Sequence, residues 1–137
     1  MGWETFNLKT INPNPVIVPA KTYTFELLVG VAKDEKGTVS ASAAIVNDGE
    51  HTGRRLTMYF PNPDAINSKG TKNEWNARDM VRLINALGLD LEDNEDPVSV
   101  LSRGAGNRFQ ASVYHTAATE EYAPQAKINL RSFRPAA

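Results

Sequence analysis

The sequence predicts an all-β barrel that carries a single helix. Five segments alternate apolar and polar residues, which is the period of a half-buried strand, and a sixth has apolar residues at helical spacing. Glycine, proline, asparagine and aspartate mark the turns between these segments. The expected strands are residues 22–32, 38–47, 54–60, 107–115 and 127–133, and the expected helix is 74–87. The helix therefore falls between the third and the fourth strand.

The N-terminal region, residues 1–21, is expected to be an extended arm rather than part of the barrel. It holds Pro13, Pro15 and Pro19. Proline fixes a backbone torsion and lacks an amide donor, so it is disfavoured in helices and central strands. We therefore expect the barrel domain to cover residues 22–135.

The first three strands are expected to be joined by two hairpin turns. The turns are 34–37 and 47–53, and the second contains an Asp-Gly step, which is a strong hairpin signal. Gly30, inside the first strand, predicts a bulge or the sharp bend that a barrel strand needs. The residues of these strands expected to face the core are Tyr23, Phe25, Leu27, Val29, Val31, Val39, Ala41, Ala43, Ile45, Leu56, Met58 and Phe60.

The predicted helix has recognisable ends. Thr71 and Asn73 are competing N-caps, and Gly88 stands where a C′ glycine belongs. A short turn is expected over 96–102, because its Asp-Pro step suits an N-cap followed by proline at the first helical position. The residues of the helix and the last two strands expected to face the core are Ala77, Met80, Val81, Ile84, Leu87, Phe109, Ala111, Val113, His115, Ile128, Leu130 and Ser132.

A helix between the third and fourth of five strands is the order of the OB-fold, a five-stranded Greek-key barrel. Such barrels commonly bind oligonucleotides or oligosaccharides on one face. The net charge of −1 opposes nucleic acid only mildly, because an acidic loop at 90–96 holds five of the sixteen acids and the remainder of the chain sums to +4. The local field is what meets phosphates. The alternative is that charges of both signs simply cover a solvated surface.

Composition and motifs argue against several other classes. With 41% hydrophobic and 23% charged residues the chain is typical of a globular protein, and no apolar run approaches the roughly 18 residues of a membrane span. The lack of cysteine and of a signal-peptide pattern predicts a cytoplasmic protein. His51 and His115 have no carboxylate at metal-ligand spacing, and no nucleophile or phosphate motif is present. We therefore expect neither an enzyme nor a metal or other cofactor.

The expected outward faces of the last three strands carry cations, aromatic rings and polar groups. Single-stranded nucleic acid is held by cations that follow its backbone and by rings on which bases stack. The candidates to neutralise phosphates are Arg54, Arg55, Arg108, Lys127 and Arg131, and the candidates to stack bases are Tyr59 and Tyr114. Trp75 is a weaker candidate, since tryptophan at a helix start is more often a barrel plug. The alternative is that the tyrosines are rim residues of the core and the arginines are solubilising.

Four short motifs carry a family resemblance. Residues 48–56, Asp-Gly-Glu-His-Thr-Gly-Arg-Arg-Leu, contain a Gly-Glu-x-x-Gly-Arg-Arg turn before the third strand. Residues 19–23 give a Pro-x-x-x-Tyr step, residues 86–89 give a Leu-Gly helix end, and residues 129–135 give Asn-Leu-x-x-Phe-x-Pro. Over about residues 16–135 the chain resembles a family of small phage-encoded proteins found with recombination and replication genes. The family is regarded as OB-fold single-stranded DNA-binding proteins.

The resemblance implies non-sequence-specific binding of single-stranded DNA in phage replication or recombination, in the host cytoplasm. Phage recombination or replication proteins are the implied protein partners. Lys21 stands where the family has glycine, and the end at residues 134–137 lacks the acidic tail through which bacterial single-strand-binding proteins recruit partners. DNA against RNA preference, binding-site size and oligomeric state, with a homodimer as one option, stay open.

A function of another class also fits the sequence. A β-barrel interaction protein or virion structural protein would use an exposed strand edge or the arm of residues 1–21 to contact protein, without binding nucleic acid. Oligosaccharide binding would call for more exposed tryptophan than the two that this chain has.

Overall fold

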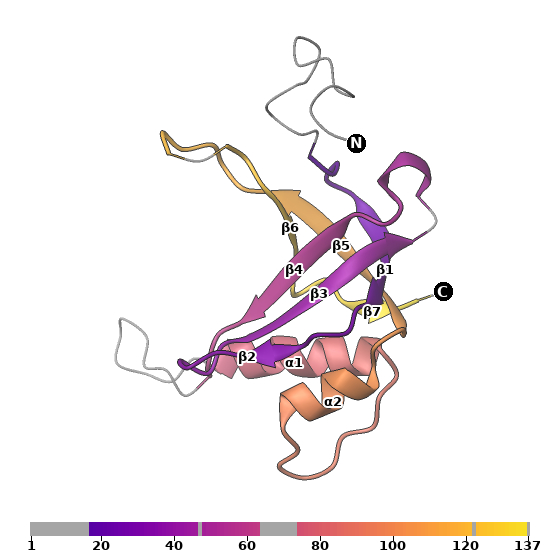
Figure 1. The fold of residues 1–137 in the computed structure, drawn as a ribbon, viewed down its shortest axis with the longest axis vertical. Helices are drawn as coiled ribbons and strands as arrows, with labels where there is room; N and C mark the ends of the chain where they lie inside the picture. Colours follow the sequence, from indigo (N-terminus) through magenta and orange to yellow (C-terminus); the bar gives the residue numbers. More distant parts are fainter. Residues whose placement is uncertain (1–16, 47, 64–73, 122, 137) are drawn as a thin grey trace, which may run out of the picture.

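The structure, a computed structural model, describes residues 17–46, 48–63, 74–121 and 123–136 (Figure 1). Its elements in chain order are β1 (Thr22–Leu27), β2 (Ala32–Lys33), β3 (Val39–Val46), the 3₁₀ turn η3 (Gly49–His51), β4 (Arg55–Phe60), α1 (Glu74–Ala86), α2 (Pro97–Arg103), β5 (Arg108–His115), β6 (Ala126–Ile128) and β7 (Arg134–Pro135). The expected order of strands around the helix α1 is therefore present.

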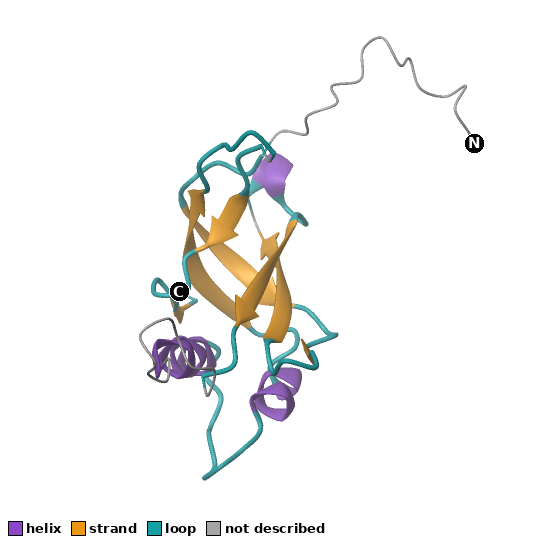
Figure 2. Cartoon of the chain, turned by 90° about the vertical axis from the view of Figure 1, so that its left-hand side faces the viewer, coloured by secondary structure: helices purple, strands orange, loops and turns teal. Residues whose placement is uncertain are grey.

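The strands form one curled antiparallel sheet. β3 lies between β1 and β4, and the other edge of β1 pairs with β5. β5 pairs in turn with β6 and β7, while the short β2 extends the β1 edge of β3. β4 and β6, at the two ends of this order, lie beside each other. The sheet thus curls into a half-barrel, consistent with a β-barrel, and two helices lie at one end of it (Figure 2). This confirms the predicted predominance of β-structure.

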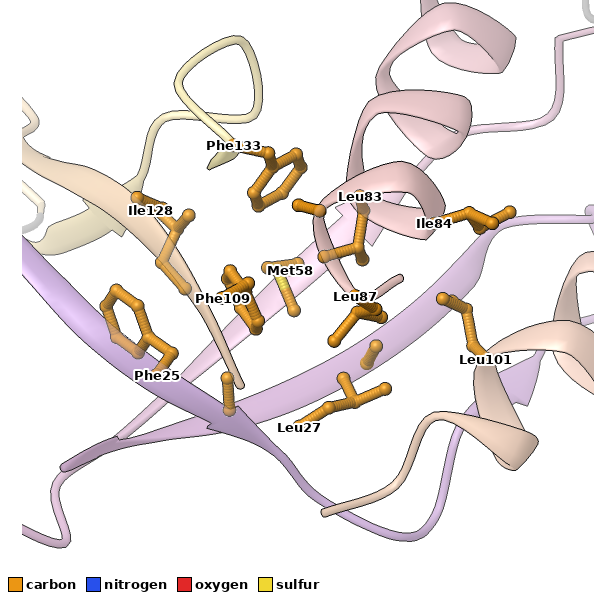
Figure 3. Packing of buried hydrophobic residues seen from close by; sticks show 14 of the residues in the cluster. Phe25, Leu27, Met58, Leu83, Ile84, Leu87, Leu101, Phe109, Ile128 and Phe133 are labelled. Atoms are coloured by element: carbon orange, nitrogen blue, oxygen red, sulfur yellow. The ribbon is translucent and has the colours of Figure 1, made fainter. Parts of the chain in front are cut away.

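The hydrophobic core fills the inside of the curled sheet, and the helices close its end. Phe25 of β1 stacks on Phe109 of β5 with ring centroids 5.5 Å apart, and both are fully buried. Leu83 and Ile84 of α1 and Leu101 of α2 lie in the same cluster (Figure 3). Burial of a side chain of this size contributes roughly 1.5–3 kcal/mol. These contacts therefore hold α1 and α2 against the sheet.

The predicted bend in the first strand is present, and it divides the strand in two. β1 ends at Leu27, and Gly30 has a φ of +97°, in the left-handed region that favours glycine. Val29, which the alternation places in the core, is 84% exposed because it precedes this bend. Val31 is half-buried and packs against the core. The two-fold periodicity therefore holds only up to Leu27.

The helix α1 ends as predicted. Gly88 has a φ of +72°. The N–H of Leu89 donates to the carbonyl of Ile84 at 3.2 Å, and the N–H of Gly88 donates to that of Asn85 at 3.0 Å. These are the two hydrogen bonds of a Schellman motif, which satisfies the last carbonyls of a helix. The candidate N-caps at 71 and 73 lie outside the described residues.

The buried face of α1 differs in part from the prediction. The predicted core residues that are buried are Met80, Ile84 and Leu87. Ala77 and Val81 are exposed instead, and Leu83 is fully buried. The buried stripe therefore runs through residues 80, 83, 84 and 87, at the three- and four-residue spacing of one helix face.

The acidic loop and the turn after it are more ordered than predicted. The turn expected over 96–102 is the helix α2, which continues to Arg103. Arg103 donates to the carbonyl of Asp90 at 2.8 Å and pairs with the carboxylate of Glu95. An ion pair also connects the loop to β2, because Nζ of Lys33 lies 3.6 Å from Oδ1 of Asp96. The acidic block is thus mostly exposed, but it is tied to α2 and β2.

The prediction for the fifth strand is the least accurate one. The structure has two short strands there, β6 and β7, in place of a continuous strand. Ile128 of β6 is opposite Val113, yet Arg134 of β7 is opposite Gln110, where an unbroken antiparallel ladder would place residue 131. Three extra residues therefore loop out between β6 and β7. Leu130 and Ser132, expected in the core, are only half-buried in or beside this turn.

Phe133 is the clearest consequence of that interruption. Strict alternation from Lys127 puts it on the outer face, whereas it is only 8% exposed. Its ring lies 6.4 Å from that of Phe60 and 5.5 Å from that of Phe109, centroid to centroid. The three looped-out residues shift the alternation by an odd number of positions, so the side chain of Phe133 faces the core.

The last part of the predicted arm is attached to the sheet. Val18 is buried, and its carbonyl accepts a hydrogen bond from Nε2 of His115 at 2.7 Å. His115 is therefore exposed at the end of β5 rather than in the core as predicted. The hydroxyl of Tyr23 donates to the carbonyl of Pro19 at 2.8 Å. Residues 1–16 of the arm lie outside the described residues. Within the described residues, neither helix has the length and apolar character needed to cross a membrane.

Candidate nucleic-acid interface

The outer face of β4 carries the side chains that the alternation predicts. Arg55, Thr57 and Tyr59 are exposed. Met58 and Phe60, on either side of Tyr59 in the chain, are buried. Tyr59 is 55% exposed. A hydroxyl hydrogen bond of 2.9 Å between Ser42 of β3 and Thr57 joins the two strands on this face. Arg55 and Tyr59 are thereby held on the same side of a paired strand.

Lys127 lies between two exposed tyrosines that come from different strands. On β6 it is opposite Tyr114 of β5, and the two share the outer face. Its ammonium lies 5.9 Å from the centroid of the Tyr59 ring. Such a contact at an exposed site contributes about 0.5–1 kcal/mol. Tyr114 is 48% exposed, so both rings keep surface available to a ligand.

A second group of cations and a ring lies at the start of α1. The guanidinium carbon of Arg131 lies 4.9 Å from the centroid of the Trp75 indole, and that of Arg78 lies 4.7 Å from it. Trp75 is 49% exposed, so the expectation of a barrel plug is wrong and its candidacy as a surface residue is strengthened. The carboxylate of Glu74 also lies 3.7 Å from the guanidinium of Arg78.

The turn between β6 and β7 brings Arg131 to Trp75. Asn129 holds the turn, because its Oδ1 accepts from the N–H of Arg131 at 3.0 Å. Its carbonyl accepts from the N–H of Ser132 at 3.0 Å and from the Ser132 hydroxyl at 2.6 Å. The three extra residues thus form a closed turn that displays Arg131 next to α1.

The exposed side chains form one continuous series, which we call the cation–aromatic strip. The strip consists of Arg55, Tyr59, Lys127, Tyr114, Arg131, Trp75 and Arg78. Tyr114 and Arg131 are linked because both line a shallow cavity of about 470 Å³. The strip therefore runs from β4 across β6 and β5 to α1.

Two of the predicted phosphate contacts lie elsewhere. Arg108 is at the opposite end of β5 from Tyr114, and its Nε is 3.8 Å from a carboxylate oxygen of Glu26 on β1. Arg54 precedes β4 at the end away from Tyr59, and its backbone carbonyl accepts from the N–H of Ile45 at 2.9 Å. Neither residue is part of the strip, although Arg108 shares the outer face of the sheet.

Sequence reasoning missed Arg78 as a site residue. It is exposed, and it lies over the indole and 3.7 Å from Glu74. Its spacing of three residues from Trp75 on a helix is the signal that finds it, because side chains three apart are neighbours on a helix surface. Asp79, on the same helix, was not singled out and is 8% exposed.

The acidic block lies beside α1, because Glu92 and Glu95 line a cavity together with Asn76 and Ala77 of that helix. The chain that carries it loops between α1 and α2, at the end of the molecule away from β6 (Figure 1). A hydrogen bond from Arg103 lowers the pKa of Glu95 below that of an ordinary glutamate, with a smaller contribution from the backbone of Glu92. Glu95 therefore has Arg103 as its cationic partner, and Asp96 has Lys33. Among the described residues, no cluster of three or more metal-ligating side chains is present.

Comparison with known proteins assigns no family. No protein-family model matches the chain, and a search of curated proteins finds no match. The resemblance to phage single-stranded DNA-binding proteins thus stays a prediction.

Proposed function

We propose that this chain is an OB-fold protein that binds single-stranded DNA without sequence specificity and acts in phage DNA replication or recombination. The cation–aromatic strip carries the proposal. Two exposed rings, Tyr59 and Trp75, each have a cation within about 6 Å, and the strip continues across two strands and a helix. The order of strand pairing, with β4 beside β6, supports the OB-fold. The phage context rests on the family resemblance alone.

The mechanism divides the strip into two kinds of contact. Arg55, Lys127 and Arg131 bind phosphates, and each contact releases counterions condensed on the strand. Tyr59 and Tyr114 stack bases, at about 1–3 kcal/mol per base whatever the sequence, since every base has a π-face. The bases of a duplex are stacked on one another, so their faces are not accessible to the tyrosine rings. The strip therefore favours single strands over duplexes.

Trp75 has a different part from the two tyrosines. Arg78 and Arg131 already lie over its indole. It therefore holds the two guanidiniums at the surface, where each binds a phosphate of the strand. This assigns to Arg78 a phosphate contact in addition to those predicted from the sequence.

An electrophoretic shift titration tests the proposal. Oligo-dT and a duplex of equal length are titrated at about 50 and 200 mM salt, where electrostatic binding changes strongly. With four phosphates neutralised and a slope of about −0.7 for each in single strands, the affinity for oligo-dT should fall roughly 50-fold between the two salts. Binding of duplex should be weaker at both.

The same titration distinguishes the alternative class of function. No shift of oligo-dT at the lower salt, together with a stable assembly in the absence of nucleic acid, would favour a protein-interaction or virion structural role. An affinity that does not depend on salt would also contradict the proposed mechanism, because cation–phosphate contacts cannot be independent of salt.

A further inference from the structure

The shallow cavity of about 470 Å³ beside Tyr114 lies within the strip and is lined in part by an acidic residue. Tyr114 and Arg131 line it, and so does Asp79 of α1. The cavity is open to solvent rather than enclosed. A cavity that joins an exposed ring to a guanidinium offers an unstacked nucleotide a surface for its base and a partner for its phosphate.

Asp79 is an acid in a surface that otherwise favours anions. It is only 8% exposed, and its Oδ1 accepts from Nη1 of Arg82 at 2.6 Å. A carboxylate has about four acceptor positions on its two oxygens. Arg82 takes one of these positions, and Asp79 lines the cavity in which a ligand would take others. The carboxylate of Asp79 repels phosphate, so it is unsuited to bind the backbone of the strand. It is suited to accept hydrogen bonds from a base.

An ionised carboxylate accepts hydrogen bonds and donates none, so it discriminates between bases by their donors. Guanine presents two adjacent donors on its Watson–Crick edge, N1–H and the N2 amino group. Adenine, cytosine and thymine each place one donor next to an acceptor on that edge. Guanine alone therefore matches both oxygens of a carboxylate.

On the basis of the proposed function, we infer that this cavity is a guanine-selective subsite within an otherwise non-specific strip. The base lies against Tyr114, Asp79 accepts from N1–H and the N2 amino group, and Arg131 binds the adjoining phosphate. The subsite gives the protein a preference for strands that hold an accessible guanine. It leaves binding of other sequences to the remainder of the strip.

Fluorescence anisotropy with 5′-labelled oligonucleotides of about 15 nucleotides tests this, since binding sites of one OB-fold cover at most about that length. The series is dT throughout, and dT with one central dG, deoxyinosine, dA or dC. A single guanine also avoids four-stranded structures. The strand shifts register to place the guanine in the subsite. We expect roughly fivefold or tighter binding for dG than for dT, because a bidentate pair discriminates by at least about that factor.

Deoxyinosine keeps N1–H but lacks the N2 amino group, so its affinity should fall between those of dG and dA. This comparison uses the unaltered protein and holds even if a variant fails to fold. Asp79→Asn replaces an acceptor by an amide that also donates, and should abolish the ratio of dG to dT affinity. Asp93→Asn makes the same change at an exposed position of the acidic loop and should preserve that ratio.

The outcomes separate the subsite from the proposed function. Equal affinity for all five oligonucleotides, with ordinary binding of oligo-dT, overturns the guanine subsite and leaves the proposed function intact. A guanine preference that survives in folded Asp79→Asn overturns the role of the carboxylate. Absence of binding to every oligonucleotide at about 50 mM salt overturns the proposed function itself.

Discussion

The hydroxyl of Ser132 accepts a hydrogen bond from the backbone N–H of Ser112 at 2.7 Å. Ser112 lies in β5 where the β5–β6 ladder ends, and the N–H of Asn129 donates to its carbonyl at 2.8 Å. The side chain of Ser132 thus takes the place of the strand carbonyl that an unbroken ladder would supply. Because this hydroxyl is the acceptor, three residues loop out and the amide of Ser112 still has a hydrogen bond. Arg131 lies in that loop.

Ser132→Ala should therefore lower the free energy of unfolding by about 1–2 kcal/mol, because a part-buried amide loses its acceptor. Chemical denaturation of the two proteins measures the difference. Ser99→Ala, at an exposed position of α2, is the matched control and should change stability by less than about 0.5 kcal/mol. Equal effects of the two substitutions would show that the Ser112–Ser132 bond does not stabilise the turn.

The two tyrosines of the strip supply stacking surface rather than stability. Tyr59→Ala combined with Tyr114→Ala should weaken oligo-dT binding by at least tenfold, because each ring contributes about 1–3 kcal/mol per stacked base. Thermal unfolding should stay close to that of the parent, since both rings are about half exposed.

The matched control keeps the rings and removes only the hydroxyls. Tyr59→Phe with Tyr114→Phe should bind oligo-dT nearly as tightly as the parent. A folded alanine double variant with unchanged affinity would instead restore the interpretation of both residues as rim residues of the core.

Arg131 and Arg108 should differ in their effect on the salt dependence of binding. Arg131→Gln removes a cation of the strip, so the slope of log affinity against log salt should become shallower by about 0.7. Arg108→Gln should change the slope less, because Arg108 lies at the far end of β5 beside Glu26. Titrations of oligo-dT at four salt concentrations give both slopes.

Lys36→Gln, an exposed residue in the β2–β3 turn, serves as the control for a general loss of charge. It should lower affinity slightly and leave the slope close to that of the parent. Equal changes of slope in all three variants would mean that phosphates are not bound by the strip in particular.

The Glu95–Arg103 pair should make stability depend on pH in the acid range. Arg103 lowers the pKa of Glu95 in the folded protein, so the unfolded chain binds a proton at a higher pH than the folded one does. The contribution to stability is present above the unfolded pKa and is lost as the pH falls through the folded pKa. Between about pH 5 and pH 3 the melting temperature should fall more steeply in the parent than in Glu95→Gln.

Thermal unfolding monitored by circular dichroism measures these slopes. Glu92→Gln, in the same loop and exposed, is the control and should retain the steeper decline of the parent. Parallel curves for the parent and Glu95→Gln would mean that the pair does not stabilise the folded state.

Local patterns predicted those parts of the fold that depend on neighbours in the chain. The outer face of β4 follows from the alternation of Arg55, Thr57 and Tyr59, and the end of α1 follows from Gly88. The bend at Gly30 was also expected, but its effect on Val29 was not. Periodicity assumes an unbroken strand, whereas β1 ends at Leu27 and Val29 lies between that end and the bend at Gly30.

The candidate site was predictable as a set of residue types and not as an arrangement. Tyr59, Tyr114, Lys127 and Arg131 were identified from strand faces, and Trp75 from its type. Their contacts are between elements far apart in the chain, such as Lys127 with Tyr59 and Arg131 with Trp75. The separation of Arg108 from this group also depends on the position along β5 at which other strands meet it.

The sequence alone determined the order of the strands before and after α1, and the outer-face positions of Arg55, Tyr59, Tyr114 and Lys127. Backbone periodicity and turn chemistry are local, so a single chain specifies them. Only the tertiary structure decided that the last strand breaks, that Phe133 enters the core, and that the break displays Arg131 beside Trp75. Register and side-chain contacts between distant strands arise from packing of the whole core, which no local pattern contains.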